Sequence, residues 1–357
     1  MEAADMQQML LRVVELDGSD LFLVPGAPAM VKVGGELQAI TEKKLLPPDV
    51  EQLIMASYAL ANGRSDEMLR SRGDDDFSFS LQRVCRFRCN AYKQRGTLAA
   101  TYRAVAFGLP DPVERNIPDL VMSLADYRNG MVLVTGTAGS GKSTTLACLV
   151  DRINKSRSGH IITIEDPIEY LHPHNKSLVS QREIDNDTPT FARALRGALR
   201  QAPDVIMLGE MRDSETMQVA ITAAETGHLV MSSLHTIGAA KTIDRILDSF
   251  PAEQQQQIRV QLSMVLRAVV SQRLVPCRQG GLIPVFEVMT VNSAVQNMIR
   301  DGKTHQIDNV IYGGAADRTM MSMDNELIRL CKAGKITAED AVLHAINTDT
   351  MKKRLML

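Results

Sequence analysis

The first hundred residues carry short apolar stretches that alternate with polar residues, together with two longer stretches that have helical spacing. Residues 77–81 alternate with a period of two, which is typical of a half-buried strand. The pattern predicts helices at 6–16 and 47–61, and strands at 21–24, 30–33, 37–40, 77–81, 86–92 and 98–105. We therefore expect residues 1–103 to form an α+β domain, an antiparallel sheet with helices on one face.

The middle of the chain has four short runs that are apolar at every position: 131–134, 161–164, 205–208 and 229–232. A continuous apolar run is typical of a strand that is buried on both faces, as in a parallel sheet. The segments between the runs carry apolar residues at helical spacing. Alternation of such strands and helices predicts a doubly wound α/β domain.

The stretch 104–119 contains four residues that neither a strand nor a helix interior tolerates, Gly108, Pro110, Pro112 and Pro118. We therefore assign 104–119 to a linker, 1–103 to a smaller N-terminal domain and 120–357 to a second domain. After Pro251 the pattern becomes mostly helical. It predicts an apolar helical stripe at 258–269 and further helices at 293–300, 323–333 and 338–347.

Composition narrows the function classes. The 357 residues have a formal net charge of -2 and only 4% aromatic side chains, which disfavours direct binding of nucleic acid through a basic groove with stacking platforms. No apolar run approaches the length that spans a bilayer, and the N-terminus lacks the basic start of a signal peptide. The five cysteines include no C-x-x-C pair, which excludes a four-cysteine zinc site. We expect a cytoplasmic protein.

The strongest motif follows the apolar run 131–134 and matches the pattern G-x-x-x-x-G-K-[ST]. Its glycines allow successive backbone N–H groups to point at a phosphate, and the following helix adds its positive dipole end. We expect Lys142 to reach the β- and γ-phosphates of ATP and the Ser143 hydroxyl to hold Mg²⁺. The predicted nucleotide-binding residues are Gly136, Thr137, Ala138, Gly139, Ser140, Gly141, Lys142, Ser143 and Thr144.

Acidic residues follow two other apolar runs. Glu165 directly follows the run 161–164. Glu210 follows the run 205–208, which is similar to a Walker B strand but has Gly209 in the place of the usual aspartate. The carboxyl ends of parallel strands share one edge of a sheet, so both acids are expected to face the same crevice as the phosphate loop. Capping of the next helix is the alternative role for such acids, and Asp213 or Ser214 fits it better.

Two histidines flank the run 229–232. His228 follows a glycine that ends a helix, and His235 stands at the carboxyl end of the strand, which is the functional edge. His172 and His174 are expected in an exposed loop, without a third ligand for a metal.

These blocks occur in the order phosphate loop, Ile-Glu-Asp-Pro-Ile-Glu, Gly-Glu-Met-Arg-Asp and Gly-His-Leu-Val…Leu-His-Thr. The series resembles the Walker A, Asp box, Walker B and His box of the secretion ATPase superfamily, the hexameric motors of type II secretion and type IV pili. Within it the chain is most similar to the pilus retraction ATPases, which drive twitching motility. The resemblance covers nearly the full length, including Phe87-Arg88-Cys89-Asn90 and Phe250-Pro251-Ala252-Glu253.

The resemblance implies a PAS-like N-terminal domain, a RecA-like P-loop motor domain with C-terminal helices, and ATP hydrolysis between the subunits of a homohexamer. It implies that Glu165 activates the attacking water, that Glu210 serves the metal side, and that His235 or His228 senses the γ-phosphate. Arginines of the N-terminal domain would neutralise charge, because a guanidinium stays charged and donates in a fork. The candidates are Arg88, Arg95 and Arg103, with Arg212 of the motor domain as a further one.

Two features favour retraction over assembly within the superfamily: the chain lacks the four-cysteine zinc module of the extension motors, and its motor domain begins near residue 120. One feature departs from the retraction family, whose Ala-Ile-Arg-Asn-Leu-Ile-Arg motif here has Gln296 in place of the first arginine.

Our hypothesis is a Mg²⁺-dependent ATPase ring that drives type IV pilus retraction. It would act on an inner-membrane platform protein, at the cytoplasmic face of the membrane. The alternatives are a pilus or type II secretion assembly ATPase, an accessory retraction paralogue, a RecA-type nucleic-acid motor and a nucleotide-binding scaffold without turnover.

Overall fold

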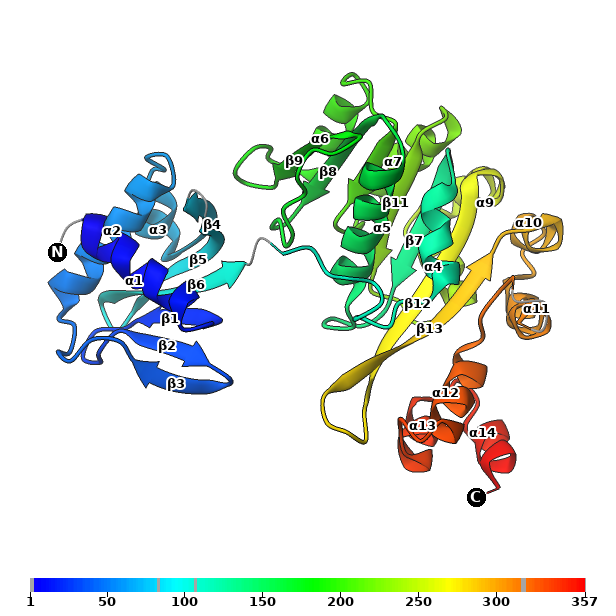
Figure 1. The fold of residues 1–357 in the computed structure, drawn as a ribbon. Coiled ribbons are helices and arrows are strands. Elements are labelled where there is room, and N and C mark those ends of the chain that lie inside the picture. The colour runs from blue at the N-terminus through cyan, green and yellow to red at the C-terminus, as the bar shows by residue number, and fades with distance from the viewer. Residues whose placement is uncertain (1–2, 82–83, 106–107, 316–318, 357) are drawn as a thin grey trace. The chain divides into compact units, whose positions relative to one another are not determined.

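The chain divides into two units (Figure 1). Each unit has a hydrophobic core of its own. The computed structural model describes residues 3–81, 84–105, 108–315 and 319–356. Unit 1 comprises Met1–Gly108 with Glu169–Leu171, and unit 2 comprises Leu109–Ile168 with His172–Leu357.

Unit 1 contains a six-stranded antiparallel sheet and three helices. Along β5, the alternate residues Cys85, Phe87, Cys89 and Ala91 are buried, because one face of the sheet packs against the helices. The sheet order is β3 (Glu36–Ala39), β2 (Met30–Val33), β1 (Asp20–Leu23), β6 (Thr97–Val105), β5 (Cys85–Gln94) and β4 (Asp74–Leu81). The helices are α1 (Ala3–Glu15), α2 (Pro47–Leu60) and α3 (Glu67–Arg72).

The α+β architecture predicted for this region is confirmed, whereas α3 was not predicted and the PAS-like assignment stays a prediction. Strand β6 continues to Val105, so residues 104 and 105 of the predicted linker lie in a strand. Residues 106 and 107 are outside the described residues, and the segment from Leu109 onward belongs to unit 2. The domain limits given above remain predictions.

Unit 2 is built on a seven-stranded sheet with helices on both faces. Its strands are parallel except for the edge strand β13. Their order is β13 (Leu282–Thr290), β12 (Leu266–Pro276), β7 (Gly130–Thr135), β11 (Leu229–Leu234), β10 (Val205–Leu208), β8 (His160–Glu165) and β9 (Leu178–Glu183). The predicted α/β class is confirmed.

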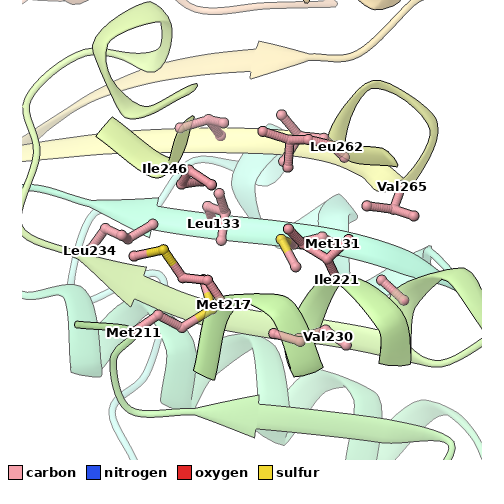
Figure 2. Packing of buried hydrophobic residues seen from close by; sticks show 14 of the residues in the cluster. Met131, Leu133, Met211, Met217, Ile221, Val230, Leu234, Ile246, Leu262 and Val265 are labelled. Atoms are coloured by element: carbon pink, nitrogen blue, oxygen red, sulfur yellow. The ribbon is translucent and has the colours of Figure 1, made fainter. Parts of the chain in front are cut away.

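Alternate residues of the central strands serve two separate cores. Val132 and Val134 of β7 point to the layer that contains α4 (Asp119–Ser123), the 3₁₀ turn Leu124–Asp126 and α5 (Lys142–Ser156). Met131 and Leu133 point to the opposite layer, where Figure 2 shows them near side chains of the covering helices. That layer contains α6 (Phe191–Ala198), α7 (Ser214–Glu225), α8 (Ala239–Asp248), α9 (Ala252–Val265), α10 (Ser293–Arg300) and α11 (Ile307–Gly314).

The C-terminal part holds a smaller core. Val275, Ile283 and Val285 of the β12–β13 hairpin pack against α12 (Met323–Lys332), α13 (Ala338–His344) and α14 (Thr348–Leu355). The helices predicted near 293–300, 323–333 and 338–347 are therefore confirmed. A second 3₁₀ turn, Thr304–Gln306, precedes α11. None of the described helices is long and apolar enough to span a bilayer.

The predicted helical stripe over 258–269 is confirmed as far as Val265 and is wrong from Leu266 onward. Helix α9 ends at Val265, and the chain continues directly into β12, which pairs in parallel with β7. A strand that is buried on both faces and a buried helix both appear as apolar runs, so periodicity alone does not separate them. Pairing with a strand more than a hundred residues earlier decides the outcome. Strands β9 and β13 and helices α4, α11 and α14 were also missed.

Candidate functional site

The phosphate loop connects β7 to α5 and is shaped by its glycines. Gly136, Gly139 and Gly141 have φ values of 149°, 74° and 88°, which side chains with a Cβ rarely adopt. A Cβ at Gly136 would also lie 2.3 Å from the backbone oxygen of Gln272. The loop therefore forms a backbone cradle at the start of a helix, the arrangement that binds phosphate.

Lys142 is buried at the first position of α5. Its Nζ donates hydrogen bonds to the carbonyls of Gly136 and Thr137, at 3.0 and 2.9 Å. The Ser140 hydroxyl is also buried, and within the described part of the chain it has no hydrogen-bond partner. A cationic amine and an unpaired hydroxyl within a glycine cradle fit an anionic ligand.

Gln272 of β12 packs against the phosphate loop and the first turn of α5, and it was not identified from the sequence. Its side chain is buried, and its Oε1 accepts a hydrogen bond from Thr145 Oγ1 at 2.7 Å. Its Nε2 would lie 2.8 Å from a Cβ at Gly141. Gln272 lies just beyond the predicted helical stripe and outside every recognised motif, so nothing in the local sequence marks it.

Glu165 lies at the carboxyl end of β8 and is 7% exposed. Its Oε1 accepts hydrogen bonds from Thr163 Oγ1 at 2.6 Å and from Gln181 Nε2 at 3.2 Å. Gln181 lies on β9, which the sequence analysis missed, so this second donor was missed as well. The two bonds orient a buried carboxylate at the edge of the sheet.

Glu210 follows β10 and is 9% exposed. Its two oxygens have different partners: Arg212 lies 2.5 Å from Oε1, and His235 Nε2 lies 3.2 Å from Oε2. The hydrogen bond to Glu210 raises the pKa of Arg212. The structure therefore brings Glu210, His235 and Arg212 together.

The parallel order of β7, β11, β10 and β8 places the phosphate loop, Glu165, Glu210 and His235 at one edge of the sheet. The ends of β8 and β10 lie close together: a Cβ at Gly209 would be in ordinary van der Waals contact with the Cα of Glu165, at 3.4 Å. This arrangement is the one expected from the strand order of a doubly wound fold.

His228 lies at the other end of β11. It precedes the strand, and its carbonyl accepts the N–H of Gly130, the first residue of β7. Its Nδ1 lies 2.9 Å from the carbonyl of Ala223 at the end of α7. This position removes His228 from the edge that carries the phosphate loop, so the structure separates the two histidines that the sequence treated together.

His172 lies in a loop, as predicted, but the prediction that it is exposed was wrong, because its side chain is buried and only 8% exposed. Burial lowers the pKa of His172 to about 4. His174 is exposed, as expected. Within the described ranges, no cluster of three or more His, Cys, Asp or Glu residues could hold a metal ion.

The arginine candidates of unit 1 lie on the β5–β6 hairpin. Arg88 and Arg103 are direct cross-strand partners, whereas Arg95 occupies the turn with a φ of 46°. Arg103 Nε donates to Asp20 Oδ1 at 2.8 Å, and Arg88 Nε lies 3.9 Å from Asp76 Oδ1. The structure therefore brings Arg88 and Arg103 together and leaves Arg95 at the far end of the hairpin.

A cavity of about 260 Å³ adjoins the phosphate loop within unit 2. The segment 114–117, assigned to the linker from the sequence, forms one wall, and β12 and β13 form another. The lining residues are Glu114, Arg115, Asn116, Ile117, Gly141, Thr144, Thr145, Gln272, Leu274, Leu282 and Pro284. Of these residues only Gly141 and Thr144 were predicted from the sequence to bind the nucleotide; the wall residues of 114–117, β12 and β13 were not.

Comparison with known proteins gives a consistent result. The family model described as type II/IV secretion system protein matches residues 113–350. A twitching motility protein of Neisseria gonorrhoeae is 42% identical over 323 residues, which are 90% of this chain and 85% of the relative. The type IV pilus retraction ATPase PilT of Pseudomonas aeruginosa is 41% identical over 337 residues, which are 94% of this chain and 97% of the relative.

Among solved structures, the crystal structure of the pilus retraction motor PilT with bound ADP aligns with a TM-score of 0.89 and 41% identity. The alignment covers 97% of this chain and 98% of that chain.

Proposed function

Because this chain belongs to the type II/IV secretion system protein family, we propose that it is an ATPase that drives type IV pilus retraction in twitching motility. One observation carries the proposal: Lys142 of the phosphate loop and the buried carboxylates of Glu165 and Glu210 share one edge of the sheet. The similarity to a pilus retraction motor solved with bound ADP supports a nucleotide as the ligand of this edge.

The chemistry follows from the charges at this edge. Phosphoryl transfer depends mainly on positioning and on electrostatic stabilisation of the transferred group. Lys142 would turn from the loop carbonyls to the β- and γ-phosphates. Glu165, oriented by Thr163 and Gln181, would orient and deprotonate the attacking water. His235 would sense the γ-phosphate through its contact with Glu210.

Mg²⁺ is the implied cofactor. The Ser143 hydroxyl and the Glu210 carboxylate are hard oxygen donors, and Mg²⁺ is usually bound by one or two carboxylates together with waters and substrate phosphates. These donors and the phosphate cradle fit the ion, and we propose Ser143 and Glu210 as its ligands. When bound, the ion neutralises charge on the phosphate oxygens.

The cavity beside the phosphate loop would take the nucleoside end of ATP. Its walls combine apolar side chains of Ile117 and Leu274 with the polar side chain of Asn116, which suits a planar heterocycle with polar edges.

Arg88 and Arg103 would act on the ATP of a neighbouring copy. They are exposed and lie side by side, and two guanidiniums that reach a triphosphate supply the charge neutralisation that phosphoryl transfer requires. This role implies a closed ring, for which we propose a homohexamer. The ring would act on an inner-membrane platform protein of the pilus, at the cytoplasmic face of the membrane.

The first experiment measures Mg²⁺-dependent ATP turnover as a function of protein concentration. If sites are completed between copies, the turnover per subunit rises steeply over the concentration range in which rings assemble. A turnover per subunit that is constant from monomer to ring would contradict shared sites.

A second experiment addresses direction. The gene is expressed in a strain that assembles pili but does not retract them, and in a strain that does not assemble them. We expect restored twitching in the first strain only. Rescue of the second would favour the assembly ATPase. Because Gln296 departs from the retraction motif, rescue that requires a resident retraction ATPase would favour an accessory paralogue.

A further inference from the structure

Glu287 lies in the middle of β13, outside the nucleotide site, and it is 3% exposed. Its cross-strand partner is Ser271 of β12, the residue before Gln272. A buried carboxylate is costly unless it is paired or well hydrogen-bonded, so its partners indicate what it does.

The partners of Glu287 are the first backbone amides of two helices. Its Oε1 accepts a hydrogen bond from the N–H of Ala239, at 3.1 Å, and the N–H of Met323 also donates to its carboxylate. Ala239 begins α8 and Met323 begins α12. The N-cap residues of these helices, Gly238 and Ser322, supply no side-chain cap of their own. One carboxylate therefore caps two helices that lie far apart in the sequence.

The start of α8 is close in sequence to the catalytic edge, because Ala239 follows His235 by four residues. The segment between them is fixed at several points. The Gly238 N–H donates to Ser271 Oγ at 2.9 Å, and Thr236 Oγ1 lies 2.7 Å from Thr242 Oγ1. The position of this segment sets how His235 meets Glu210. Glu287 thus fixes the Ala239 end of the segment 235–239, whose other end carries His235.

The start of α12 belongs to the C-terminal helices. Met321, two residues before it, pairs with Val288 of β13 through two backbone hydrogen bonds. Met323 and Leu327 of α12 pack in the C-terminal core with Val285. Any movement of α12 relative to β13 would therefore change the surroundings of Glu287.

Charged groups of three helices face this region. Burial raises the pKa of Glu287, the two amides oppose this rise, and Asp308 of α11 and Asp324 of α12 add to it; together these effects bring the pKa to about 7. Lys241 of α8 faces Asp308. The carboxylate therefore exchanges its proton near neutral pH. Protonation removes the negative charge that the two helix N-termini favour.

We propose that Glu287 is a positioning residue for ATP turnover: by capping α8 and α12 together, it holds the His235 segment in place and couples the C-terminal helices to the nucleotide site. The proposal deepens the proposed function and rests on it. Glu287 touches neither nucleotide nor water in this role and acts through α8.

The test uses the full-length chain with Glu287→Gln, which keeps the shape and one acceptor but lacks the charge. We expect kcat at pH 8 to fall about tenfold, because a charge-assisted hydrogen bond is lost, while KM for ATP changes less than twofold. Between pH 8 and pH 6 the wild-type kcat should fall with a midpoint near 7, while that of the variant stays flat. Glu253→Gln, an exposed carboxylate at the start of α9, is the matched control and should match wild type.

Hydrogen exchange at pH 8 provides a readout that does not need turnover. The amides of Ala239 and Met323 should exchange about tenfold faster in Glu287→Gln than in wild type. Equal exchange in the two proteins, or a wild-type kcat and pH profile in the variant, would overturn the proposal. A wild-type protein without ATP turnover would instead contradict the proposed function, and the exchange comparison would still decide the role of Glu287.

Discussion

The phosphate-loop edge of unit 2 and the arginine-bearing hairpin of unit 1 are built in opposite ways. The carboxylates of Glu165 and Glu210 are buried, and each has a partner from a neighbouring strand or from the residue that follows it: Gln181 of β9 and His235 after β11. The side chains of Arg88 and Arg103 are 44% and 66% exposed, and each pairs with an acid on an adjacent strand, Asp76 and Asp20 respectively. The two carboxylates are therefore fixed by the fold of a single chain, whereas the two guanidiniums lie exposed on a surface.

This difference in burial determines under which conditions each kind of charge can stabilise a bound phosphate. A buried carboxylate is preorganised, so it costs no reorganisation when charge develops on a bound phosphate. An exposed arginine pair contributes little in water, because the high dielectric screens it. The electrostatic stabilisation that the arginine pair provides becomes larger when another protein surface covers the pair and excludes water. The carboxylate edge is therefore preorganised within one copy, whereas the role that we propose for the arginines requires a second copy.

The largest effect is expected from neutralising the buried acids, which tests whether they are preorganised for catalysis. Glu165→Gln and Glu210→Gln should each lower ATP turnover about 100- to 1,000-fold, while ATP affinity stays within a few-fold of wild type. Glu215→Gln, an exposed acid of α7, is the control. Turnover assays and nucleotide titration measure both quantities. A loss of affinity as large as the loss of turnover would mean that these acids bind rather than catalyse.

The backbone of the phosphate loop is the next test. Gly136→Ala should lower the free energy of unfolding by about 3 kcal/mol or more and abolish nucleotide binding, because its Cβ would collide with Gln272. Gly139 also has a positive φ, but no atom lies within 4 Å of a Cβ there, so Gly139→Ala should cost only about 1 kcal/mol. Chemical unfolding compares the two. Equal costs would show that strain, and not contact, governs the loop.

Removing the displayed arginines should have a smaller effect on turnover. Arg88→Ala and Arg103→Ala should each reduce ATP turnover about 10- to 30-fold in assembled rings, and Arg95→Ala less than twofold. Mixing Arg103→Ala with the inactive Lys142→Ala variant should restore part of the activity, since each supplies what the other lacks. No recovery in mixed rings would argue that the arginines do not act between copies.

The smallest expected effect concerns buried His172. Its folded pKa, about 4, lies below the ordinary value of 6.5, so burial favours the neutral form. The stability it contributes is complete above pH 6.5 and is lost as the pH falls from 6.5 towards 4. Between pH 7 and pH 5, wild type should lose about 1–2 kcal/mol of unfolding free energy more than His172→Phe. Parallel unfolding slopes for the two proteins would contradict the buried, neutral state.

Much of this molecule was predictable from local pattern. Alternating residues indicated the antiparallel sheet of unit 1, and continuous apolar runs followed by helical spacing indicated the four central strands of unit 2. The phosphate loop was recognisable because its backbone geometry needs glycine at fixed positions. The edge shared by Glu165 and Glu210 followed from parallel strand order. Each of these signals acts within a few residues or through a general rule of sheet topology.

The remaining features depend on contacts between distant residues, and only the tertiary structure decided them. The last turn of the expected helix is instead the start of strand β12, because this segment pairs with β7. The same pairing brings Gln272 into hydrogen-bond contact with Thr145, 127 residues away in sequence. The separation of His228 from His235 follows from the direction of β11. Glu287 contacts the N-termini of α8 and α12 because the tertiary structure packs both helices against β13. No local pattern encodes such pairings, because the free energy that selects them arises from packing across the whole unit.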